Sequence, residues 1–263
     1  MYEPLAKALT LTHDLFRCGV PHFRERRLIP IRTSAHFIVF DVDKKSPLYT
    51  MLEVRPGDTT DVDRKDNFTD GFISLPDELC TTEEDYAQWN RENPNCPYDK
   101  GHSAGSQYRR GNQTEQSDID TLAGVCPEAP AMNRNVKGPL ESAILEMAKK
   151  CEHTYIVQGP VWGRSDDGQV LAEGTIGGGQ WIPGAVFISV LFLRRKKTLA
   201  YAWVMNNEHM MECVCLREVS LDKIEEMTGL HLWGNVASDK FNERRDKTND
   251  DDWWKKGQPS GSC

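Results

Sequence analysis

This 263-residue chain has no run approaching the ~18 consecutive apolar residues of a transmembrane helix. Its N-terminus, Met1 to Leu9, also lacks the apolar core of a signal peptide, so secretion would require a leader outside this sequence. Since 38% of the residues are hydrophobic and 27% are charged, the composition is that of a globular protein able to bury a sizeable core. We therefore expect a globular protein without a membrane partner.

An excess of positive charge is also missing, although proteins that bind nucleic acids usually carry a basic surface. The net charge of −8 is concentrated between Asp58 and Cys96, where eleven acidic residues accompany three basic ones. The rest of the chain is balanced, so a polyanionic substrate is not excluded. The acidic segment itself is open to two interpretations, a solvated loop or a segment that gates a site.

The eight cysteines include no Cys-x-x-Cys pair, and Cys213-Val214-Cys215 lies in a strand-like run, which favours a structural role over a zinc site. Their even number, with the glycosylation sequons at Asn67 and Asn112, favours disulfide bonds and an extracellular location. A mitochondrial location is the alternative. The histidines other than His102 have no metal-ligand spacing and are expected to be structural.

The hydrophobic pattern predicts a mixed α+β domain over residues 1–236 with a mainly antiparallel sheet, followed by a polar, disordered tail over 237–263. Residues from Gly57 to about Pro97 are predicted to be a long irregular segment. The predicted strands are residues 35–40, 48–54, 154–160, 185–193 and 199–205, and the predicted helices run from Pro139 to about Lys150 and from Leu221 to Thr228, the second with Ser220 as N-cap and Gly229 as its stop.

The residues that suggest chemistry begin with Asp99-Lys100-Gly101-His102, followed by Asn133 and Glu141. Hydrolysis of a phosphodiester needs a base, a cation to neutralise charge and support for the leaving oxygen. A neutral His102 can accept a proton from water, while Asn133 offers Mg²⁺ an oxygen ligand and Glu141 can orient the waters of the ion. Arg64 is a candidate for contacting the phosphate as charge develops.

Alternatives accompany three of these assignments. Asn135 competes with Asn133 as the metal ligand, although only Asn133 is followed by a Glu eight residues later. Glu141 also suits the first turn of a helix, where a carboxylate complements the helix dipole. Arg64 lies in the acidic segment, which offers it structural partners.

The ordered series of motifs resembles the DNA/RNA non-specific endonucleases, a family that includes endonuclease G and secreted bacterial nucleases. The resemblance covers about residues 18–233. It rests on residues 99–102, which are similar to the family's Asp-Arg-Gly-His, on Asn133 with Glu141, on Arg64 with Phe68 and Asp70, and on the downstream stretches Tyr155–Pro160, Ile182–Val190, Leu199–Ala202 and Ile224–Leu230.

The resemblance implies a ββα-metal (His-Me finger) fold that cleaves DNA and RNA with little sequence preference. It implies His102 as general base, Asn133 as ligand of Mg²⁺ with Mn²⁺ as a substitute, Glu141 as orienter of metal-bound water, and Arg64 as stabiliser of the transition state. It leaves monomer and homodimer both open. Substrate contacts are expected from Asp99, Lys100, Gly101, Arg109 and Arg134.

Several positions depart from the family pattern. Lys100 stands where Arg is usual, Glu128 where Gln is usual and Lys137 where Trp is usual. Gly138-Pro139 is expected to interrupt a normally continuous helix, and Leu145 replaces a frequent Arg. These departures motivate an alternative function, a catalytically weakened nuclease fold that serves as a nucleic-acid-binding or interaction module.

Overall fold

The computed structural model describes residues 27–54, 75–109, 113–162, 172–195 and 197–236. A seven-stranded sheet forms its centre, with the strand order β1-β2-β3-β6-β9-β10-β11 and antiparallel pairing throughout. The strands are β1 (Leu28–Arg32), β2 (Phe37–Asp41), β3 (Ser46–Val54), β6 (His153–Val161), β9 (Ala185–Arg194), β10 (Lys197–Asn206) and β11 (Leu216–Val219). The predicted mixed α+β class with a mainly antiparallel sheet is confirmed.

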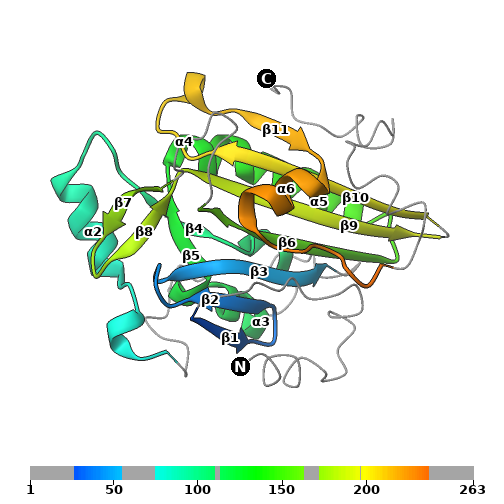
Figure 1. The fold of residues 1–263 in the computed structure, drawn as a ribbon, viewed down its shortest axis with the longest axis horizontal. Helices are drawn as coiled ribbons and strands as arrows, with labels where there is room; N and C mark the ends of the chain where they lie inside the picture. The colour runs from blue at the N-terminus through cyan, green and yellow to red at the C-terminus, as the bar shows by residue number, and fades with distance from the viewer. Residues whose placement is uncertain (1–26, 55–74, 110–112, 163–171, 196, 237–263) are drawn as a thin grey trace.

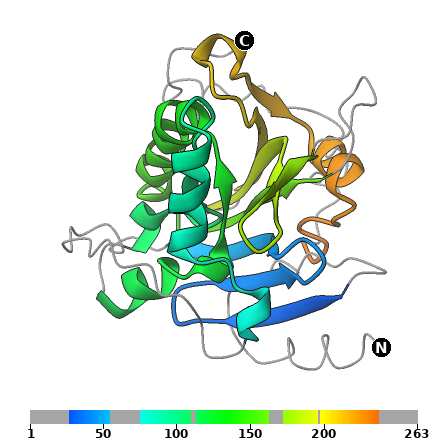
Figure 2. The ribbon, with the colours of Figure 1, turned by 90° about the vertical axis from the view of Figure 1, so that its left-hand side faces the viewer.

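Two short strand pairs and a set of helices surround this sheet, which lies between helices on its two faces (Figures 1 and 2). The pairs are β4 (Asp99–His102) with β5 (Val125–Glu128) and β7 (Ala172–Ile176) with β8 (Gln180–Pro183). The α-helices are α2 (Glu83–Glu92), α3 (Gln113–Ile119), α4 (Pro130–Met132), α5 (Gly138–Ala148) and α6 (Leu221–Thr228), joined by the π-helical turn η5 (Asn133–Lys137) and by the 3₁₀ turns η2 (Asp77–Leu79), η3 (Ser106–Arg109), η4 (Leu122–Gly124) and η6 (Met211–Cys213).

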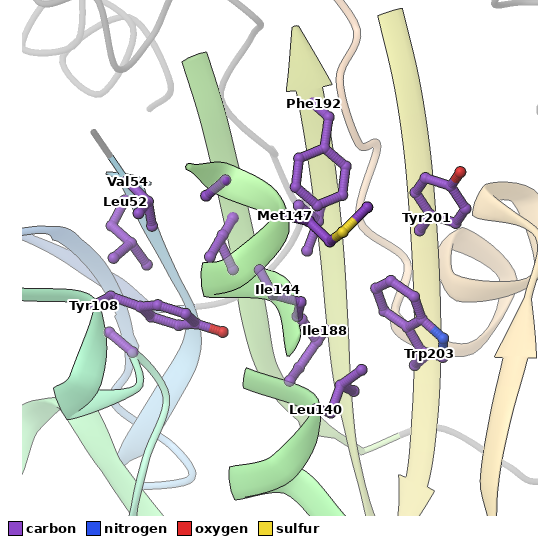
Figure 3. Packing of buried hydrophobic residues seen from close by; sticks show 14 of the residues in the cluster. Leu52, Val54, Tyr108, Leu140, Ile144, Met147, Ile188, Phe192, Tyr201 and Trp203 are labelled. Atoms are coloured by element: carbon purple, nitrogen blue, oxygen red, sulfur yellow. The ribbon is translucent and has the colours of Figure 1, made fainter. Parts of the chain in front are cut away.

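Strand β9 is apolar along most of its length because both faces of the sheet are covered. Ile188 and Phe192 point to the face that α5 covers, where Figure 3 shows them beside Ile144 and Met147. Alternate residues such as Phe187 belong to the core under α6. The two cores explain why the sequence shows no polar alternation in this strand.

Helix α6 begins and ends at the predicted residues. The Ser220 hydroxyl accepts a hydrogen bond from the Lys223 backbone N–H at 3.1 Å, which satisfies a donor of the first turn. Gly229 ends the helix in the left-handed conformation, with φ of 72°, which glycine adopts without steric cost. Both assignments are confirmed.

The predicted interruption at Gly138-Pro139 is right only in part: α5 begins there with Pro139 in its first turn, but the segment before it does not leave the helical path. Residues from Pro130 to Ala148 remain helical, because η5 inserts a wider turn before α5 and the Gly138 N–H donates to the Asn133 carbonyl, five residues back. This turn accommodates Pro139, which has no N–H to donate and whose ring would strain a regular helix.

The expectation of an irregular segment from Gly57 to Pro97 is also wrong in part, because α2 occupies residues 83–92. Thr82 and Asp85 form a reciprocal capping box at its start, which local sequence could have indicated. Residues 55–74, with Arg64 and Asn67, lie outside the described residues, as do Asn112 and the tail over 237–263. None of the described helices combines the length and apolar character needed to cross a bilayer.

Candidate active site

His102 ends strand β4, which pairs with β5 so that His102 lies opposite Val125 and Asp99 lies opposite Glu128. The His102 ring is largely buried, and its Nε2 lies 2.8 Å from Oδ1 of Asp120, whose carboxylate is 1% exposed. Asp120 follows helix α3 and was not singled out by the sequence, since no local pattern connects residues 18 positions apart. A buried carboxylate at this distance fixes the orientation of the imidazole and favours the tautomer with a proton on Nε2.

Asn133 begins the π-helical turn and is held by strand β4. Its Nδ2 donates to Oδ2 of Asp99 at 3.0 Å, which fixes which end of the amide is oxygen. Asp99 also accepts two hydrogen bonds from the exposed guanidinium of Arg134, at 2.8 and 2.5 Å. The acidic residue at the start of the motif therefore orients Asn133, while Arg134 binds both oxygens of the same carboxylate.

Glu141 lies in the first turn of α5 and is buried. Its carboxylate accepts hydrogen bonds from Gln107 Nε2 at 3.2 Å and from Gln158 Nε2 at 3.5 Å. Burial raises the pKa of Glu141 to about 7, against the opposing effect of the nearby Lys137 ammonium. Gly105 packs against it so closely that an added Cβ would lie 2.5 Å from Oε2.

His102 and Glu141 are connected through Gln158 of β6. The same Nε2 that contacts Glu141 donates to the backbone carbonyl of His102 at 3.2 Å. Gln158 belongs to one of the stretches that carry the family resemblance, but no role in the site was predicted for it. Through Gln158, the central sheet therefore holds both candidate catalytic residues by hydrogen bonds.

A buried ion pair lies between these residues. Lys137, 2% exposed, places its Nζ 2.6 and 2.8 Å from the two carboxylate oxygens of Glu128, which is fully buried. The same Nζ donates to the His102 carbonyl at 2.5 Å. Two departures from the family pattern, at Glu128 and Lys137, are therefore partners in one interaction. Burial at this depth excludes a surface phosphate contact by Lys137.

Of the remaining predicted residues, the structure describes the side chain of Lys100 and the position of Gly101. Lys100 forms an ion pair with Glu83 of α2. Gly101 lies against Glu128, where an added Cβ would be 2.1 Å from Cδ, so only glycine fits without a shift. Arg64 and the side chain of Arg109 lie outside the described part of the structure.

The residues present fit a hard cation. Within the described residues the Asn133 amide is anchored through Nδ2, and its Oδ1 accepts no hydrogen bond. An amide oxygen beside the Asp99 carboxylate suits Mg²⁺, which keeps most of its waters and binds few protein ligands. The described ranges contain no group of three or more His, Cys, Asp or Glu side chains placed to chelate a metal. Such a chelate is not what a mostly hydrated ion requires.

Four of the cysteines, Cys96, Cys126, Cys151 and Cys213, carry free thiols. The disulfide bonds expected from the even cysteine count are therefore not found at these positions. Cys126 and Cys151 are buried, and burial raises the pKa of both thiols, which makes them unreactive.

The antiparallel sheet is flanked by a strand pair and a helical segment, and a histidine hydrogen-bonded to a carboxylate lies between them. This arrangement fits a nuclease. The family model of DNA/RNA non-specific endonucleases matches residues 22–239, and this chain belongs to that family of nucleases, which hydrolyse nucleic acids. A solved chain in a structure described as the EndoG/EndoGI complex, showing the mechanism of EndoG inhibition, is similar in fold: the TM-score is 0.71 at 18% identity, over 84% of this chain and 91% of that one. No curated protein matches this chain.

Proposed function

We propose that this protein is a Mg²⁺-dependent endonuclease that hydrolyses phosphodiester bonds in both DNA and RNA with little sequence preference. The observation that carries the proposal is the attachment of strand β4 to the helical segment 130–148 at both ends. Asp99 anchors Asn133 at the start of the strand, and His102 accepts from Lys137 at its end. The candidate base and the candidate metal ligand are thereby held on one rigid unit.

In this proposal His102 is the general base. Because the Asp120 carboxylate accepts a hydrogen bond from Nε2–H, Nδ1 is the nitrogen that takes a proton from the attacking water. The partner carboxylate stabilises the imidazolium that results. Asp120 does not itself take the proton.

Asn133 would hold the cation through Oδ1, and Glu141 would orient its waters. The bound ion supplies charge neutralisation at the phosphate and at the leaving oxygen. Because the pKa of Glu141 is raised to about 7, its carboxyl must lose a proton to accept hydrogen bonds from those waters through both oxygens. Arg64 and Arg109 are proposed to contact the phosphate.

The test is cleavage of supercoiled plasmid and of single-stranded RNA by the purified protein in Mg²⁺, in Mn²⁺ and in EDTA. We expect both substrates to be cut in either metal and neither in EDTA, and His102→Ala to lower the rate at least ~100-fold. His153→Ala is a matched control, since His153 also contacts a buried carboxylate, with Nδ1 2.7 Å from Glu53 Oε1. Binding without cleavage in every metal would instead identify the non-catalytic nucleic-acid-binding module.

A further inference from the structure

The ammonium group of Lys137 links its own turn to two strands. It lies on η5, four residues after Asn133 and four before Glu141, and it contacts the backbone of β4 and the Glu128 carboxylate of β5. Residues of the same turn differ in exposure: Arg134 and Asn135 are exposed, whereas Lys137 is buried. The Lys137 side chain therefore points into the protein. A single buried cation therefore ties the turn that carries Asn133 to the strand that carries His102.

Charge explains why a lysine can occupy this place. Burial alone would lower the pKa of Lys137, but the carboxylates of Glu128 and Glu141 outweigh burial and raise it, so the side chain remains an ammonium. An ammonium has three donors, and the two Glu128 oxygens together with the His102 carbonyl accept them. Gly101 allows the Glu128 side chain to lie against strand β4, since any side chain at position 101 would overlap Glu128.

We infer that Lys137 is a positioning residue for His102, and that Glu128 holds that lysine in place inside the protein. This inference rests on the proposed function. The Asp120 carboxylate fixes the ring of His102, while Lys137 and Gln158 fix its carbonyl. Without Lys137 that carbonyl keeps the Gln158 donor at 3.2 Å, and we expect the ring to lose its fixed placement relative to Asn133.

A stable apolar replacement separates positioning from simple stability. Lys137→Met alone would leave the Glu128 charge buried without its cation, so the informative variant is the double one, Lys137→Met with Glu128→Met, because apolar replacement of a buried ion pair is often neutral for folding. We expect its kcat on plasmid to fall about tenfold or more, with KM within about twofold of the unmodified protein, since substrate contacts are unchanged.

The matched control is Lys149→Met with Glu146→Met, the same chemical change in an exposed pair in the last part of the same helical segment, where Nζ and Oε1 are 2.5 Å apart. It should keep its kcat. All variants are assayed well below their Tm, with circular dichroism to confirm folding. A folded Lys137/Glu128 variant with unchanged kcat would overturn the inference.

A second readout does not depend on cleavage. The imidazole NMR signals of His102, assigned by their absence in His102→Ala, should shift in the Lys137/Glu128 variant, while those of His153 should stay in place. If the unmodified protein cleaves nothing, the proposed function fails and these signals alone decide the role of Lys137. Unchanged His102 signals would then refute it.

Discussion

The imidazole of His102 lies against the carboxylate of Asp120, with 2.8 Å between Nε2 and Oδ1. Both groups are shielded from water, since the two side chains are 12% and 1% exposed. A charge-assisted hydrogen bond in such surroundings is stronger than one at the surface. The pair therefore orients the ring, selects its tautomer and favours the imidazolium that forms when the base accepts a proton.

Asp120→Asn should lower kcat by roughly 10- to 100-fold with little change in KM, because general-base catalysis contributes ~10²–10⁴-fold and only part of it depends on the partner. The substituted amide would be isosteric, yet it would be able to present its NH₂ group to Nε2 and stabilise the wrong tautomer. Steady-state cleavage of a fluorescent oligonucleotide measures both constants.

Asp118→Asn provides the control for this substitution. Asp118 lies two residues away and also accepts hydrogen bonds, from the N–H and hydroxyl of Ser34, at 2.8 and 2.5 Å. It has no contact with His102, so its loss should leave kcat unchanged. Equal effects of the two variants would show that Asp120 acts on folding and not on the histidine.

Sequence was sufficient for features with a local or periodic signal. Helix α6 could be bounded because Ser220 and Gly229 satisfy backbone groups of the same helix, and the strand over Ala185–Leu193 followed from its continuous apolar residues. Helix α2 has an equally local signal at Thr82 and Asp85, but the surrounding acidic residues favoured a loop. Composition there outweighed the capping pattern and gave the wrong prediction.

The supports of the candidate site were not predictable in this way. Asp120, Gln107 and Gln158 reach His102 and Glu141 from separate elements, so only the folded chain brings them together. Lys137 was visible as a departure from the family, and so was Glu128. Their pairing required the π-helical turn, which places residue 137 on the inner side of a segment where Gly-Pro suggested a break.

Asp99→Ala should lower the affinity of the protein for Mg²⁺ about 10- to 100-fold, because partners that orient a metal ligand contribute that much to metal affinity. The reason is that Asn133 would lose the acceptor that holds its Nδ2 and would rotate its amide. The measurement is cleavage rate against Mg²⁺ concentration, with the half-saturating concentration as the result.

Arg134→Ala is the companion variant, since Arg134 contacts the same carboxylate from the solvent side. An orienting role of Asp99 predicts that the half-saturating Mg²⁺ concentration changes by less than threefold in this variant. If Arg134 also contacts the substrate, its loss raises KM instead. A Mg²⁺ requirement that is unaltered in Asp99→Ala would remove Asp99 from the support of the metal site.

Glu141 should make the metal-free protein less stable as pH rises. Because burial raises the pKa of its carboxyl from an ordinary 4.5 to about 7, the folded state keeps a proton that the unfolded state releases between these values. The folded state then binds more protons, so the free energy of unfolding falls by roughly 3 kcal/mol from pH 4.5 to 7 and changes no further above that range.

Glu141→Gln has no such group, and its stability relative to the unmodified protein should increase over the same interval. Urea unfolding in EDTA at pH 5 and pH 8 measures the two differences, with the exposed Glu146→Gln as control. A difference that is the same at both pH values would show that Glu141 is ionised throughout.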